Sequence, residues 1–153
     1  MSVAAHMVRF IDFTIVAWLV VQQTDSSSAV GLLVFFRVIP FLIFGPFVGA
    51  LLDRYSRIAV YRRTQLGMTV VAFAFAAANF SDSTSLAVIY TYTAVSGVLF
   101  MIEIPSRRAY MSGIVGPAAL GSALALDMVS LNVAWFAGSN LGGFIVKLID
   151  PAW

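Results

Sequence analysis

Long apolar runs alternate with short polar segments along the whole chain. The apolar runs lie at residues 6–22, 29–52, 58–80, 86–104 and 120–149. A helix that crosses the hydrocarbon core of a bilayer needs about 20 apolar residues, and each run approaches or exceeds that length. The runs are too long and too continuous for the alternating strands of a membrane barrel. The pattern therefore predicts an all-α, polytopic membrane helix bundle of about five transmembrane helices, formed as one transmembrane domain over residues 1–153.

The composition agrees with a membrane protein and excludes several other classes. Of the 153 residues, 61% are hydrophobic and only 10% are charged, whereas soluble domains carry about 25% charged residues. Disorder is excluded because it requires low hydrophobicity and high charge. The chain has no cysteine and a single histidine, His6, so we expect no metal site and no cofactor.

The arrangement of reactive and basic residues argues against an enzyme and against nucleic-acid binding. No nucleophile stands beside a base in the sequence, and no phosphate-cradling glycine loop occurs. The arginines form a collar around the ends of the spans and do not form a folded basic patch. We therefore predict a membrane protein that is not an enzyme and has no nucleic-acid partner.

Basic residues occupy alternate connections between the spans. The second connection contains Arg54, Arg57, Arg62 and Arg63, and the fourth contains Arg107 and Arg108, whereas the first and third contain no basic residue. Basic connections stay on the cytoplasmic side of a membrane. The chain is therefore predicted to be a multi-pass protein of the cell membrane with a cytoplasmic amino terminus.

Four of the charged side chains within the apolar runs are candidate functional residues. Arg37 lies within the second run and must find a partner there, because a charge in the bilayer centre costs at least about 2.5–3.5 kcal/mol. Asp12 lies at a similar depth, so we predict an Asp12–Arg37 pair. In one interpretation Asp12 is a titratable carboxylate in a water-filled cavity that couples protons to transport; in the other the pair is permanent and fixes helix register. Glu103 lies at the cytoplasmic end of the fourth run, and Asp127 lies deeper in the fifth.

Small residues at helical spacing predict close helix packing. The pairs are Gly45 with Gly49 and Gly138 with Gly142, and each places two glycines on one helix face. We expect both faces to be left exposed by this chain and to bind another helical unit. Asn132 and Asn140 are expected to form hydrogen bonds across helices.

Two stretches resemble a known family. The segment GPFVGALLDRYSR, from Gly45 to Arg57, is similar to the loop signature G-x-L-x-D-R-x-G-R-R of the major facilitator superfamily. The matching positions are Gly49, Leu51, Asp53, Arg54 and Arg57, whereas Ser56 and Ile58 depart from the signature. EIPSRRAY, followed by LALDMVSLNVAWFAGSNLGG, resembles the drug and siderophore exporter branch, often called transmembrane secretion effectors. Its matching positions are Pro105, Arg107, Leu126, Asn132, Gly138, Gly142 and Gly143.

The resemblance implies a function and a role for the loop motif. It implies proton-coupled export of small amphipathic compounds by alternating access. Asp53 would act as a gate near the amino-terminal end of a helix in the other half, and Asp53 is also spaced to meet Arg57. Family members carry about twelve spans in two halves, so the chain is expected to be an amino-terminal fragment.

The expected partners follow from this interpretation. They are the lipid bilayer, a small-molecule substrate, and either a missing carboxy-terminal half or a second copy of the chain. The alternative is a non-transporting small membrane protein that assembles with another membrane component.

Overall fold

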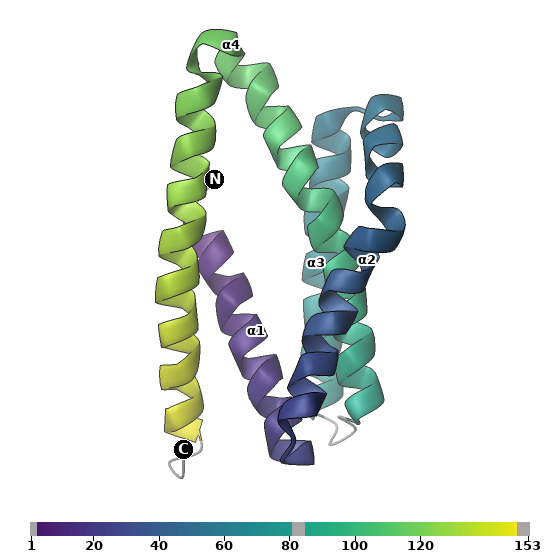
Figure 1. Cartoon of the computed structure of the whole chain (residues 1–153), viewed down its shortest axis with the longest axis vertical. Coiled ribbons are helices and arrows are strands. Elements are labelled where there is room, and N and C mark those ends of the chain that lie inside the picture. Colours follow the sequence, from purple (N-terminus) through teal and green to yellow (C-terminus); the bar gives the residue numbers. More distant parts are fainter. Residues whose placement is uncertain (1–2, 81–84, 150–153) are drawn as a thin grey trace.

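The described part of the chain, residues 3–80 and 85–149 of a computed structural model, is all-α and contains no strand. Its helices are α1 (Val3–Thr24), α2 (Ser27–Arg54), α3 (Arg57–Phe80) and α4 (Leu86–Ile149). They run roughly along one long axis (Figure 1). The α2–α3 connection lies at the upper end of the bundle in this view, and the α1–α2 connection lies at the lower end. The all-α prediction is confirmed.

Helix α4 folds back on itself at a single glycine. Gly116 has a φ of 72° and a ψ of 170°, which are not helical angles, and glycine adopts a positive φ without steric cost. Pro117 follows and favours a new helical start, since its ring fixes φ near the helical value. The two arms of α4, residues 86–115 and 117–149, therefore form a hairpin (Figure 1).

The hairpin corrects one predicted boundary. The fourth run was expected to end at Ile104 and to be followed by a connection, but the helix continues through Pro105 as far as the kink. Each arm is about 45 Å long at 1.5 Å per residue, which is longer than the hydrocarbon core of a bilayer. The apolar runs therefore correspond to α1, α2, α3 and the two arms of α4.

Helix α4 is the central element of the bundle, because α1, α2 and α3 all pack against it. A buried apolar cluster joins α1, α2 and the first arm of α4. Its members are Val16, Val20, Ala29, Leu33 and Ile89. Close packing here fixes the ends of three helices beside one another.

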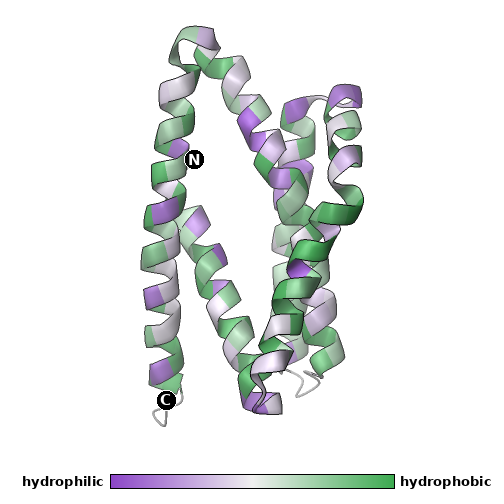
Figure 2. Cartoon of the chain, viewed as in Figure 1, coloured by the Kyte–Doolittle hydropathy of each residue, from purple (hydrophilic) through white to green (hydrophobic). Residues whose placement is uncertain are grey.

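Most of the outer surface is apolar, as a lipid environment requires. Leu42, Phe73 and Phe136 are each more than 70% exposed, and hydrophobic residues cover much of every helix (Figure 2). By length and composition, α1, α2 and α4 could each cross a membrane. Helix α3 begins with a basic segment that contains Arg57, Arg62 and Arg63, which lowers its mean hydropathy.

The two glycine pairs differ in whether another helix covers them. A β-carbon at Gly138 would lie 2.7 Å from the carbonyl oxygen of Met7, and one at Gly142 would lie 2.8 Å from the Cβ of Thr14. Helix α1 therefore covers this face, and the expectation that it is left exposed was wrong. A β-carbon at Gly45 or Gly49 would meet nothing within 4 Å, so this face of α2 is open in the described structure.

Candidate functional site

All four helices contribute to an open cavity between them, in which a few polar groups lie on a mostly apolar lining. The cavity has a volume of about 330 Å³. Its polar lining comes from Arg9, Asp12, Arg37, Gln65, Thr69, Tyr92 and Ser96, and its apolar lining from Ala5, Val8, Met68, Ala72 and Phe100. A pocket of about this size, with a few convergent polar groups on an apolar wall, suits a small organic ligand.

Asp12 and Arg37 lie on the same cavity but do not bind each other. The Tyr92 hydroxyl donates a hydrogen bond of 2.8 Å to the Oδ1 atom of Asp12. The Arg37 guanidinium lies over the ring of Phe13, 4.6 Å from its centroid, and 5.9 Å from that of Phe100. Among the described residues, no Asp12–Arg37 ion pair lies within 4.0 Å. The predicted direct pair was therefore wrong, because Tyr92 and the two phenylalanine rings take the nearest positions.

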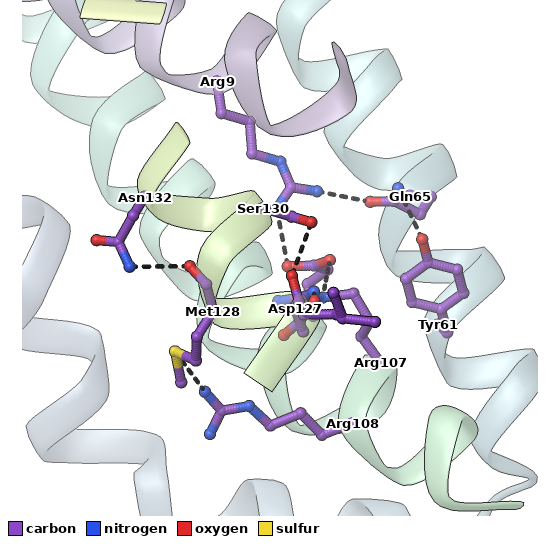
Figure 3. Close-up of polar contacts among 11 residues, drawn as sticks. Arg9, Tyr61, Gln65, Arg107, Arg108, Asp127, Met128, Ser130 and Asn132 are labelled. Carbon is purple, nitrogen blue, oxygen red and sulfur yellow. Dashed lines mark hydrogen bonds and ion pairs between the residues drawn. The ribbon is translucent and has the colours of Figure 1, made fainter. Parts of the chain in front are cut away.

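A buried network of ion pairs borders this cavity and begins at Arg9. The guanidinium of Arg9 donates hydrogen bonds to the Oε2 atom of Glu103, at 2.8 Å, and to the Oε1 atom of Gln65, at 2.9 Å. Figure 3 shows Arg9 reaching from α1 toward Gln65 on α3. Arg9 thus joins three helices through polar contacts.

The network continues through Arg107 to the second arm of α4. The Nε atom of Arg107 lies 3.3 Å from the Oε1 atom of Glu103, and its Nη1 atom binds the Oδ1 atom of Asp127. Glu103 and Arg107 are at most 1% exposed, and Asp127 is also buried. Because Asp127 lies on the opposite arm, this contact ties the α4 hairpin together (Figure 3).

The loop-motif residues lie away from the cavity, at the end of α2. Asp53, Arg54 and Arg57 are all exposed. Helix α2 ends at Arg54, and Tyr55 is extended with a φ of −121°. The helical spacing expected for Asp53 and Arg57 therefore does not apply. Arg57 instead donates to the carbonyl oxygen of Ala109 on α4, at 3.4 Å.

Arg108, Asn132 and Asn140 form their side-chain contacts with other residues of α4. Arg108 lies 4.0 Å from the sulfur of Met128 on the opposite arm. The side-chain amides of Asn132 and Asn140 donate to the carbonyl oxygens of Met128 and Phe136, one turn back in the same helix. The expectation that they bond across helices was therefore wrong, because both side chains are exposed and their own backbone is nearer.

Comparison with known proteins identifies the family. Residues 1–153 match the Major Facilitator Superfamily along their whole length. The chain belongs to this superfamily. It is also similar to a Staphyloferrin A transporter of Staphylococcus aureus (strain NCTC 8325 / PS 47), with 22% identity over 132 residues. That match covers 86% of this chain and 33% of the relative, so the chain spans about a third of the relative's length. No solved structure matches the chain.

Membership of the Major Facilitator Superfamily associates the chain with membrane transport. The bundle of apolar helices agrees with a multi-pass membrane protein in a lipid bilayer. Members of the family bind small-molecule substrates, and the open cavity of this chain carries a few polar groups on a mostly apolar lining.

Reasoning from the sequence missed several residues of the site. No contact was predicted for Arg9, Gln65 or Tyr92. A signal was available for Arg9, because it precedes Asp12 by three residues and so shares one face of α1 with it. His6, two per cent exposed, is also buried beside this network. No comparable signal pointed to Gln65 or Tyr92.

Proposed function

We propose that the chain forms part of the amino-terminal half of a secondary transporter that exports small amphipathic compounds by proton-coupled alternating access. The observation that carries this proposal is the cavity lined by Asp12 and Arg37. Charged side chains inside membrane helices are costly and commonly mark substrate or ion pathways, and transporter sites lie between helices near the bilayer midplane. The similarity to a Staphyloferrin A transporter supports a small-molecule cargo.

The orientation is part of the same proposal. The ends of α2 and α3 that carry Arg54, Arg57, Arg62 and Arg63 would face the cytoplasm of the cell, and so would the amino terminus. Asp53, exposed at the end of α2, would then be free to meet a helix amino terminus in the other half and to act as a gate. Accessibility of a cysteine introduced at Arg62, labelled in intact cells and in inverted vesicles, tests the orientation. Labelling in intact cells would refute it.

The partner of the open face of α2 would be a second helical unit, either a carboxy-terminal half or another copy of the chain. Gly45 and Gly49 leave room for a close backbone approach on that face. Cysteine crosslinking from Gly45→Cys in native membranes tests this. Crosslinks from this position, and none from Gly142→Cys beneath α1, are expected; the reverse pattern would contradict the proposal.

The transport proposal is tested by flux of a fluorescent drug into inverted vesicles that contain the complete product of the gene. Asp12→Asn is expected to flatten the pH dependence of flux, because it removes the carboxylate that would carry the proton. Arg63→Gln, an exposed arginine of α3, is the matched control and should retain the wild-type profile. An unchanged pH dependence in Asp12→Asn would remove Asp12 from coupling.

A further inference from the structure

We propose that the cavity binds the carboxylate of a small organic acid through the guanidinium of Arg37. The inference rests on the proposed transport function and names the charged group that its substrate would carry. Arg37 lines the cavity, and among residues 3–80 and 85–149 it has neither a hydrogen bond nor an ion pair. Its contacts are with aromatic rings.

The guanidinium of Arg37 has N–H donors that no described residue accepts. A guanidinium carries five N–H donors in a planar fork that matches a carboxylate with two parallel hydrogen bonds. Arg37 is only partly exposed, and charge-assisted hydrogen bonds are stronger where water is partly excluded, so a ligand that supplies two oxygens gains more here than at a surface arginine. The rings of Phe13 and Phe100 contact the guanidinium, and such contacts restrict its orientation.

The carboxylate of Asp12 does not occupy the hydrogen-bond donors of Arg37 that a ligand would use. The Oδ1 atom of Asp12 accepts a hydrogen bond of 2.8 Å from the Tyr92 hydroxyl, and Asp12 makes no ion pair with Arg37 among the described residues. Glu103, the other nearby carboxylate, is held by Arg9 and Arg107. Because Arg9 is paired with Glu103, the guanidinium of Arg37 is the cationic group of the lining that has no ion pair among the described residues and stays available to an anion.

The backbone around Arg37 is held in place. A β-carbon at Gly97 would lie 2.5 Å from the carbonyl oxygen of Arg37, so α2 and the first arm of α4 are in direct backbone contact at this point. This close approach limits movement of Arg37 relative to Tyr92 and Ser96, which lie on the same arm. A site held in this way loses less entropy when the ligand binds.

The shape of the cavity narrows the ligand class further. A volume of about 330 Å³ is near the lower end for organic ligands. Val8, Met68 and Phe100 add apolar groups to the lining, and the ring centroid of Phe100 lies 5.9 Å from the guanidinium of Arg37. The geometry suits one carboxylate attached to a compact apolar or aromatic body.

Three nearly isosteric probes test this inference by fluorine NMR on the whole chain in uncharged detergent micelles. They are para-fluorobenzoate, para-fluorobenzamide and para-fluorobenzamidine, which are negative, neutral and positive. We expect para-fluorobenzoate to bind at least about tenfold more tightly than the other two, because only the carboxylate gains charge-assisted hydrogen bonds. Arg37→Gln should abolish that preference, Arg37→Lys should retain part of it, and Arg63→Gln should leave it unchanged.

The outcomes separate this inference from the transport proposal. Equal binding of the three probes, a preference for the cation, or a benzoate preference that survives Arg37→Gln would each overturn the carboxylate site. The comparison of probes on the wild-type chain needs no variant to fold. Because the readout is binding and not flux, a carboxylate site found in a protein that fails the flux assay would refute only the transport proposal.

Discussion

The two groups of charged side chains in the bundle differ in whether they satisfy one another. In the network of Arg9, Glu103, Arg107 and Asp127, each charged group contacts a group of opposite sign. In the cavity, Asp12 is bound by a neutral hydroxyl and Arg37 by aromatic rings. Both arrangements carry the cost of removing charge from water. The network offsets part of this cost by ion pairing, although the Nη2 atom of Arg107 and the Oδ2 atom of Asp127 are buried without a hydrogen bond within the described part of the chain. In the cavity, Arg37 has no ion pair among the described residues and can bind a ligand.

The comparison assigns different roles to the two regions. The network connects α1 to both arms of α4, and through Gln65 it reaches α3. Loss of a member should therefore loosen the bundle. The cavity groups hold no helices together by ion pairs, so their replacement should alter binding or transport more than stability. The predictions below test this division.

The largest effect is expected for Glu103→Gln. Glu103 is fully buried and contacts both Arg9 and Arg107, so its neutralisation leaves buried guanidinium charge without compensation. Removal of one partner from a buried ion pair costs about 3–5 kcal/mol. The free energy of unfolding, measured from helicity during SDS titration of detergent micelles, should fall by about this amount.

The matched control for Glu103→Gln is Asp53→Asn, which neutralises an exposed carboxylate at the end of α2. Its effect should stay within about 0.5 kcal/mol. If Glu103→Gln were as mild as Asp53→Asn, the network would not stabilise the bundle and the division between the two regions would fail.

The second effect comes from the helix contact that holds α1 beside the network. Gly138→Ala places a methyl group against the backbone of Met7, and overpacking of this kind costs about 1–3 kcal/mol. Gly45→Ala is the matched substitution on the open face of α2, where alanine should stabilise the helix by up to about 1 kcal/mol. Opposite signs for the two changes in unfolding free energy are the expected result, and equal destabilisation would show that the α1–α4 contact has no special role.

A smaller effect on stability is expected in the cavity. Tyr92→Phe removes the hydroxyl that binds Asp12, and hydrogen bonds between membrane helices contribute about 0.6 kcal/mol on average, with a maximum near 1.7. The same variant frees the Asp12 carboxylate to approach Arg37, so the affinity for para-fluorobenzoate should fall. A stability loss as large as that of Glu103→Gln, with unchanged benzoate affinity, would place Tyr92 in the structural group.

The sequence predicted the helices well and their contacts poorly, for a physical reason. Apolar length determines whether a segment can span a bilayer, so the runs could be located without knowing their neighbours. The reversal at Gly116 falls within the predicted connection between residues 104 and 120, but its position at one glycine was not predicted, because glycine is tolerated both in membrane helices and at their ends.

The contacts required information that periodicity does not contain. Arg107 and Asp127 were both predicted as site residues. Whether they meet each other depends on how the α4 hairpin closes, which the sequence pattern does not show. Asp12 and Arg37 were predicted to lie at a similar depth, and both line the cavity, but a similar depth does not exclude another partner such as Tyr92. The roles in transport stay predictions for the same reason.

The smallest effect is expected for Asn132→Ala, which tests whether polarity alone explains the effect of the network. Asn132 follows Asp127 on the second arm of α4, but its amide donates to the carbonyl oxygen of Met128 and its side chain is exposed. Because that carbonyl oxygen also belongs to the helix's own hydrogen-bond ladder, loss of the amide should change the free energy of unfolding by less than about 0.5 kcal/mol. SDS titration beside Asp127→Asn gives the comparison, since Asp127 is buried and paired with Arg107. A loss at Asn132 equal to that at Asp127 would mean that any polar group on this arm stabilises the bundle, and the distinction between paired and unpaired charges would then lose its meaning.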